Sequence, residues 1–589
     1  MMIEKNLKNI GVVDDLPAAS HVSEDTAYSQ QPALPWSILL SGLAFVVCTL
    51  LMVAPLSRVV GSPIIARLST SKLLVMWGSW LPADFYFPTD HKNSLSSTAI
   101  ILFLSLIAIA FSIYAFSIWF MRRQPREGNN RQIISIIGLV TFIAGMIFVL
   151  TPAMLSHDIY VYAGYGRIIA AHGTNPYFTS LTSFPHDPFV PLDDWAAGIA
   201  AYGPVWLTIC ASFAWILGIE PIRYIIAFRL LGLIAHLLNA LLIYKILQKM
   251  GRSPRTVTLG TLLYAWNPLA LMESSLGGHN DMLMMTFILW GLLLYVRGEQ
   301  RGLTRPGSYL PPIVAFTLAA LIKYTSGPLI IFFLVILARK AFITSVSITS
   351  RGNFRSNWHL ALQKPLFACI VGGSLALALY IPYWIGHSIW SIIHSFSAPP
   401  SSVGIEYSMM SAINAWITKY GYPTTPWAYT FFKVFSNHSV WNNINVVVII
   451  VTIIIGIVWL WRNPTMRVFV LAILLTLGSL LIVTPWFFPW YVVWLVAFAA
   501  IVLPYSGDTI GRALTAFALV FSVSAFSVYI FNGYEPIGRW ISWDCFTTIG
   551  PPILAFLCVF LIGKTRHLPV RRQGLFAVPN EDREDSLEN

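Results

Sequence analysis

Apolar runs of about 20 residues, the length of a helix that crosses the hydrocarbon core of a bilayer, recur along this chain and constrain its fold more than any other feature. The first of these runs covers residues 36–56. Only 11% of the 589 residues are charged, whereas soluble proteins carry roughly a quarter. The sequence therefore predicts an all-α, polytopic integral membrane protein.

Basic clusters between the runs predict how the chain is oriented. Short loops in which Lys and Arg outnumber acids face the cytoplasm, and here they lie at 122–131, 245–255, 297–305, 339–355, 462–467 and 564–572. The outer loops are then 57–96, 154–203, 386–442 and 532–547, and both termini are cytoplasmic. That orientation needs an even number of crossings, and the runs give about 14 transmembrane helices. These loops account for the net charge of +12, so we expect no nucleic-acid partner.

Two apolar segments are not predicted to form a single transmembrane helix. Residues 204–219 begin after Tyr-Gly-Pro and are short, so we expect them to lie in the interface or to re-enter the membrane. Residues 311–338 are interrupted by LIKYTSGP, which predicts two short helices that meet at an outward-facing kink. In contrast, 256–272 and 488–504 are each predicted to cross once.

Composition excludes several other kinds of site. The five cysteines are scattered without a CxxC pair, so neither a disulfide framework nor a zinc site is expected. Residues 1–35 are polar with mixed charge, which predicts a disordered cytoplasmic segment. That segment is too acidic for a secretory leader, and the run that follows is interpreted as an uncleaved membrane helix.

We expect the chemistry in the loop that follows the third run, because it gathers acids, histidines and aromatic residues. Its first acid, Asp158, lies at the end of a crossing, where partial desolvation would raise its pKa and suit it to act as a general base. A second acid, Asp281, opens a later run on the same predicted face. For each of them, capping a helix N-terminus is the alternative role. Two acids on one face predict a shared active site with Asp158 and Asp281 as catalytic residues.

Side chains near the two acids suit a sugar, since a pyranose offers an apolar face and hydroxyl edges to rings and amides. The alternative for the aromatic residues, including the run PWFFPWYVVW at 485–494, is a belt at the membrane interface. The predicted substrate-binding residues are His157, Tyr160, Tyr162, Arg167, Asn175, Tyr177, Tyr202, His279 and Asn280.

Three cations near the same face suit a phosphate. Lys323 lies inside an apolar run, where an unpaired charge costs a few kcal/mol, so it needs an anionic partner. Arg223 and Arg229 lie near the outer end of the run 222–244. All three are predicted to bind a lipid phosphate, and the alternative is that their head groups extend to the interface.

Taken in order, several motifs resemble those of the GT-C glycosyltransferases: HDIYVYAGYGRI, GTNPY, AYGPVW, NPLALMESSLGGHNDMLM, LIKYTSGPL and PWYVVW. Over residues 150–500 they are most similar to the polyprenol-phosphate-mannose-dependent α-(1→6)-mannosyltransferases of bacterial envelopes. The resemblance implies an inverting enzyme that uses a lipid-phosphate sugar on the extracytoplasmic side. It also implies that Asp158 is the base, that Asp281 is the second acid and that Lys323 lies near the lipid phosphate.

The resemblance also divides the chain. In many members the catalytic loop follows the first crossing, but here it follows the third, so residues 36–131 are interpreted as an added N-terminal transmembrane hairpin. A GT-C-like catalytic core then spans 132–345, with the outer loop 154–203. The rest is a C-terminal transmembrane part, 346–563, with the outer loop 386–442, and a cytoplasmic tail, 564–589.

The expected function is transfer of a hexose, with mannose favoured, from a polyprenyl-phosphate donor to an extracytoplasmic glycan or glycolipid acceptor. No cofactor is expected, because Lys and Arg can stabilise the leaving phosphate, although Asp158, Asp281 and His279 could hold a divalent metal weakly. A transporter or flippase of lipid-linked saccharide is one alternative, and it would place its ionisable residues at the membrane midplane. A polysaccharide ligase or polymerase is another.

Overall fold

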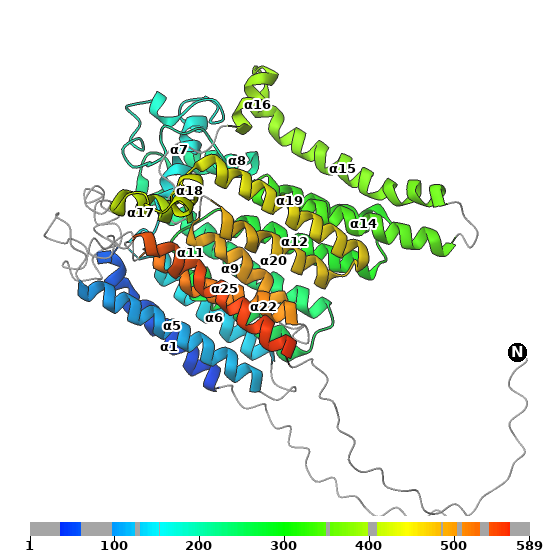
Figure 1. Ribbon diagram of the computed structural model, residues 1–589, viewed down its shortest axis with the longest axis horizontal. Helices are drawn as coiled ribbons and strands as arrows, with labels where there is room; N and C mark the ends of the chain where they lie inside the picture. The colour runs from blue at the N-terminus through cyan, green and yellow to red at the C-terminus, as the bar shows by residue number, and fades with distance from the viewer. Residues whose placement is uncertain are drawn as a thin grey trace, which may run out of the picture.

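In a computed structural model of the protein, every described element is a helix (Figure 1). The structure describes residues 36–59, 97–123, 130–151, 153–348, 354–397, 409–484, 487–502, 509–529 and 541–565. The α-helices are α1 Trp36–Val59, α5 Ser97–Arg123, α6 Asn130–Val149, α7 Asp158–Ala170, α8 Pro204–Leu217, α9 Pro221–Lys249, α10 Pro254–Ala265, α11 Pro268–Ser275, α12 Asp281–Gln300, α13 Pro306–Ala320, α14 Gly327–Ile348, α15 Phe354–Trp384, α16 Ile389–Ser397, α17 Met409–Tyr420, α18 Pro426–Phe435, α19 His438–Arg462, α20 Met466–Val483, α21 Val492–Val502, α22 Thr509–Ser524 and α25 Ile541–Thr565. Short 3-10 turns are η1 Leu181–Ser183, η2 Tyr324–Ser326 and η3 Pro489–Tyr491.

Eleven helical segments in the described residues are long and apolar enough to cross a membrane. Many of them carry large apolar side chains on an exposed face, as Leu43 in α1, Leu139 in α6 and Ile370 in α15 do. Such faces belong in lipid, because an apolar surface of this extent is unfavourable in water. The predicted class, an all-α polytopic membrane protein, is confirmed.

The sequence predicts about 14 transmembrane helices, whereas eleven of the described segments are long enough to cross a membrane. Three of the predicted crossings account for the difference. The predicted crossing 256–272 is two helices, α10 and α11, because the Asn267 side chain accepts a hydrogen bond from the Ala270 N–H and Pro268 begins a new helix. Such a cap and a proline at the first helical position end one helix and start the next. The other two segments, α13 with 15 residues and α21 with 11, are shorter than a span.

The short segment 204–219 and the kink within 311–338 are both present in the structure. The segment 204–219 forms α8, a helix of 14 residues that packs on α7 and is too short for a span. The predicted kink within 311–338 lies where α13 ends at Ala320 and α14 begins at Gly327, with η2 between them. This kink and α7 supply most of the polar residues discussed below.

The two ends of the helix bundle differ in chemistry. Helix α12 begins with Asp281 and has Arg297 in its last turn, and its 20 residues correspond to a length of about 30 Å. At the basic end, Arg255 donates to the Met121 carbonyl, and Gln300 donates to the Lys249 carbonyl. The ends of α5, α9 and α12 therefore meet there, as the charge pattern predicts, although which end faces the cytoplasm stays a prediction.

The opposite end carries the short helices. Helices α7 and α8 lie there together with α16, α17 and α18 of the predicted outer loop 386–442 (Figure 1). Several predicted features lie outside the described residues, namely the segment 1–35, most of the loops 57–96 and 532–547, and nearly all of the tail 564–589.

A close backbone contact holds the end of the loop 154–203 against the kink. The Gly203 N–H donates to the Ile322 carbonyl at 3.2 Å, and the Val205 N–H donates to the Leu321 carbonyl at 3.1 Å. A Cβ atom on Gly203 would lie 2.0 Å from the Leu321 oxygen. Glycine is therefore required at this position, and the contact brings Tyr202 close to the segment that carries Lys323.

Replacing Gly203 with alanine should destabilise the protein, because the new methyl group cannot fit against the Leu321 carbonyl. Forced overpacking of this kind costs about 1–3 kcal/mol. The measurement is the thermal unfolding midpoint of the purified full chain, which should fall. The matched control is Gly327→Ala at the other end of the kink, where a Cβ meets nothing within 4 Å. Equal midpoints for the two variants would contradict the contact.

Candidate active site

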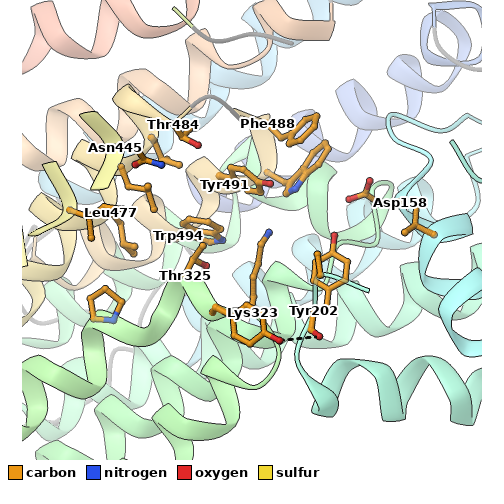
Figure 2. A pocket seen from close by; sticks show the side chains of 18 of the residues that line it. Asp158, Tyr202, Lys323, Thr325, Asn445, Leu477, Thr484, Phe488, Tyr491 and Trp494 are labelled. Carbon is orange, nitrogen blue, oxygen red and sulfur yellow. Dashed lines mark hydrogen bonds between the residues drawn. The ribbon is translucent and has the colours of Figure 1, made fainter. Parts of the chain in front are cut away.

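A cavity of about 540 Å³ lies at the end of the bundle that carries α7 and the kink. One part of its wall is polar and aromatic, with Asp158, Tyr202 and Lys323. The other part is mostly apolar and comes from α19 and α20, as with Ile449 and Leu477. Figure 2 shows the Lys323 side chain between Asp158 on one side and Leu477 on the other. The cavity therefore suits a ligand with a polar end and an apolar end.

Asp158 is the first residue of α7, and its side chain is 17% exposed. One turn later, the Tyr162 hydroxyl lies 3.3 Å from Asp158 Oδ2 and 3.5 Å from Asn280 Oδ1. The Nδ1 atom of His279 lies 3.3 Å from Asp158 Oδ2. The motifs HDIYVY and GGHND, which are distant in sequence, thus meet at this carboxylate, as the sequence predicts.

The electrostatic environment of Asp158 differs from the prediction. Burial alone would raise the pKa of this carboxyl, but its contact with His279 and the charge of Lys323 outweigh that effect and hold the pKa below its ordinary value. The expectation of a raised pKa is wrong because it considered desolvation without the neighbouring cations. Asp158 is therefore ionised at neutral pH and can accept a proton.

Asp281 lies behind the cavity wall. Its carboxylate is fully buried and accepts hydrogen bonds from Lys323 Nζ at 2.8 and 3.0 Å and from Trp494 Nε1 at 2.8 Å. Lys323 and Trp494 both line the cavity. Asp281 therefore reaches the cavity through Lys323, and the expectation that both aspartates face the cavity holds for Asp158 alone.

Neither aspartate is at the N-cap position of its helix. The N-cap residues are His157 for α7 and Asn280 for α12, and neither makes a side-chain capping hydrogen bond. Asp158 and Asp281 are the first helical residues instead, and Asp281 bonds to Lys323 and Trp494. The helix starts thus place two acids at one end of the bundle without using them as caps.

Aromatic side chains surround Lys323. Its Nζ atom lies 4.2 Å from the ring centre of Tyr491 and 5.3 Å from that of Trp494, distances at which a cation is attracted to a ring face. Tyr202 lines the same part of the cavity. Within the run 485–494, the residues Phe488, Trp490, Tyr491 and Trp494 line the cavity.

Several predicted substrate-binding residues hold the loop together and do not line the cavity. Arg167 binds Asp187 at 2.8 and 2.9 Å, and His157 binds Asp194 at 2.6 Å. Asn175 donates to the Tyr383 carbonyl, and the Tyr177 hydroxyl donates to the Tyr202 carbonyl at 2.8 Å. Tyr160 is fully buried beside Phe189.

The two predicted phosphate-binding arginines also lie elsewhere. Arg229 is fully buried and donates hydrogen bonds to the carbonyls of Val149, Thr151, Ala153 and Leu276. Arg223 is exposed, and its guanidinium donates to the Leu217 carbonyl at 3.1 Å. Neither lines the cavity, so Lys323 is the predicted phosphate ligand that the structure brings to it.

A buried acid that the sequence analysis did not select lies next to these residues. Glu273 in α11 is fully buried, and its Oε2 atom is 3.4 Å from His279 Nε2. An acid within an apolar membrane segment is costly and is commonly functional, and this signal was present in the motif NPLALMESSLGGHND. Among the residues that the structure describes, no group of three or more His, Cys, Asp or Glu side chains could hold a metal ion.

Comparison with known proteins identifies the relatives of this chain. Residues 59–339 match a family model described as "Alpha-(1->6)-mannopyranosyltransferase, N-terminal domain". Over this region the chain is similar to the alpha-(1->6)-mannopyranosyltransferases. The resemblance predicted from the motifs is thereby confirmed, and the matched region contains Asp158, Glu273, Asp281 and Lys323.

Two curated relatives come from Corynebacterium glutamicum. Alpha-(1->6)-mannopyranosyltransferase A is 26% identical over 145 residues, which are 24% of this chain and 29% of the relative. Alpha-(1->6)-mannopyranosyltransferase B is 27% identical over 187 residues, 30% of each chain. The matches therefore span less than a third of the length of these relatives. No solved structure matches the chain.

Replacing Arg229 with glutamine should destabilise the fold without any ligand present, because several buried carbonyls lose their charged donor. Hydrogen bonds to charged groups are worth about 1.5–3 kcal/mol each, so the thermal unfolding midpoint should fall clearly. Arg223→Gln, which removes an exposed cation, should leave the midpoint nearly unchanged. A stable Arg229→Gln variant with weakened binding of a lipid phosphate would contradict the structural role.

Proposed function

We propose that this protein is an inverting glycosyltransferase that moves mannose from a polyprenyl-phosphate donor to a hydroxyl of a glycan or glycolipid, on the extracytoplasmic side of the membrane. One observation carries the proposal: the carboxylate of Asp158 and the ammonium group of Lys323 line one cavity, and the part of its wall on α19 and α20 is mostly apolar. The family match supports the choice of mannose.

The shape of the cavity supports a lipid-linked donor. The apolar wall on α19 and α20 offers Ile449, Leu477 and Leu480 to a polyprenyl chain. Lys323 lies between this wall and Asp158 (Figure 2). An ammonium group has three N–H donors, and two of those of Lys323 bind Asp281. In the proposed complex the third binds the donor phosphate.

Asp158 is the proposed base. The acceptor oxygen forms a bond to the anomeric carbon of the sugar while its proton passes to the Asp158 carboxylate. The bond between that carbon and the phosphate oxygen breaks, and the electron pair leaves with the phosphate. Attack from the side opposite the phosphate inverts the anomeric centre. A base whose pKa lies below its ordinary value is available at neutral pH, and such proton transfer contributes roughly 10²–10⁴-fold to rate.

Lys323 is the proposed electrostatic stabiliser of the leaving phosphate. Charge that develops on a leaving group is best stabilised by a fixed cation in a site that excludes water. The Lys323 side chain is 12% exposed and is held by a fully buried carboxylate. Asp281 is therefore proposed as a positioning residue for Lys323, and we propose that the reaction requires no metal ion.

Replacing Asp158 with asparagine should lower mannosyl transfer by about 10²-fold or more, because asparagine cannot accept the acceptor proton. The measurement is transfer of labelled mannose from polyprenyl-phosphate mannose to a synthetic mannoside by the full chain in lipid nanodiscs. Running the assay with EDTA tests the metal-free proposal at the same time.

Glu299→Gln serves as the control, since this carboxylate pairs with Lys340 near the last turn of α12 and does not line the cavity. Its activity should stay within a few-fold of the parent. Transfer by Asp158→Asn at the level of this control would overturn the base assignment. Loss of transfer in EDTA, restored by a divalent cation, would overturn the metal-free mechanism.

A further inference from the structure

A chain of buried ionisable groups runs from the cavity into the protein. Asp158 lies on the cavity wall, and His279 Nδ1 is 3.3 Å from its Oδ2 atom. On the other side of the imidazole, His279 Nε2 is 3.4 Å from Glu273 Oε2. The Tyr529 hydroxyl donates to Glu273 Oε1 at 2.5 Å. Glu273 and Tyr529 do not line the cavity.

The imidazole of His279 is held between two carboxylates and a ring. It is fully buried and stacks on Trp490, with ring centres 3.8 Å apart and planes 16° apart. Burial disfavours the protonated form of an imidazole, whereas each adjacent carboxylate favours it. Burial is outweighed here by Asp158 and Glu273 together, so that the pKa of His279 rises to about 9.

Glu273 in turn has one cationic partner in the described part of the chain, and that partner is His279. A fully buried carboxylate without a partner is strongly unfavourable. Since α11 contributes Glu273 and the α11–α12 connection contributes His279, the pair is fixed by a short stretch of sequence. This arrangement needs a reason beyond packing, because an apolar residue would fill the same place at lower cost.

We propose that Glu273 is a positioning residue for the base: it keeps His279 protonated between the two carboxylates, and His279 keeps Asp158 ionised and oriented towards the cavity. The inference rests on the proposed function, because it explains why Asp158 is ionised by its role as the base in that function. The coupling among the three residues is a property of the protein and exists without substrate.

Other charged or titratable groups around Asp158 act on it in both directions. Lys323 favours its ionised form, as the contact with His279 does. Asp193 and the hydroxyls of Tyr162, Tyr202 and Tyr491 are also close enough to interact with it, and Asp281 is neutralised by Lys323. The polar partners of Glu273 in the described part of the chain are His279 and Tyr529, and of these two His279 contacts Asp158, so we expect a change at Glu273 to reach Asp158 through His279.

The test is the protonation midpoint of Asp158 in Glu273→Gln, measured in the full chain in lipid nanodiscs. Infrared difference spectra over a pH titration, with Asp158→Asn as the blank, isolate the Asp158 carboxyl band. The variant should raise the midpoint by about one pH unit or more, the size of effect that an adjacent charge has. Loss of the cation leaves the desolvation of Asp158 uncompensated, which is why the shift is upward.

The pH dependence of mannosyl transfer provides a second measurement. A base must be ionised to work, so a higher midpoint moves the acid limb of the pH profile of kcat/KM to higher pH by the same amount. Transfer from polyprenyl-phosphate mannose by Glu273→Gln should then fall below that of the parent at acid pH and return to within a few-fold of it at pH values well above the raised midpoint. A variant that is merely misfolded would lose activity at every pH.

Four further variants complete the design. Tyr529→Phe, which removes one hydrogen bond to Glu273, should shift the midpoint in the same direction by less. His279→Gln should shift it at least as much as Glu273→Gln, and the double variant should add little. Glu299→Gln is the matched control, because Glu299 pairs with Lys340 near the basic end of α12, and its midpoint should equal that of the parent.

A folded Glu273→Gln variant with an unchanged or lowered midpoint overturns the inference. If that variant does not fold, unchanged midpoints in both Tyr529→Phe and His279→Gln overturn it instead. The infrared result stands whether or not the parent transfers mannose. An inactive parent with the predicted midpoint shifts would thus contradict the proposed function and support the coupling.

Discussion

The site depends on a buried ion pair between Lys323 and Asp281. Taking both charges out of water costs several kcal/mol each, and the pair compensates that cost with two short hydrogen bonds and a third from Trp494. Lys323 can occupy this position only because the chain breaks between α13 and α14 and the break is held by the Gly203 backbone. The cation is then fixed in the cavity wall with one donor free for a ligand, which a flexible surface lysine could not offer.

The cavity combines this fixed charge with an apolar wall. A free sugar or a free phosphate would leave the side chains of α19 and α20 without a partner, whereas the proposed amphipathic donor would fill both parts. Asp158 lies on the polar side, and its charge is maintained from behind by His279. Two basic side chains thus have separate places: Lys323 towards the proposed leaving group, and His279 beside the proposed base. This separation of charges supports a transfer reaction rather than simple binding.

Much of this could be predicted from the sequence, because the strongest signals were local. The apolar runs predict the membrane class, and Asp158 at the end of one run and Lys323 inside another were both predicted to lie near one face, where the structure has both in the lining of one cavity. Arg229 was misassigned because its four carbonyl partners come from segments about 50–80 positions away, which no single sequence reveals. The apolar wall of α19 and α20 was missed for the same reason. The break at Asn267-Pro268 and the buried Glu273, however, carried readable signals: a helix cap and an acid among apolar residues.

The most direct test of the account is a structure of the protein with polyprenyl-phosphate mannose bound. We expect a phosphate oxygen within hydrogen-bonding distance of Lys323 Nζ, about 3 Å, the sugar on the side of Asp158, and the lipid chain along α19 and α20. A phosphate bound at Arg223 or at the basic end of α12, with the cavity between Asp158 and Lys323 left unfilled, would contradict the account.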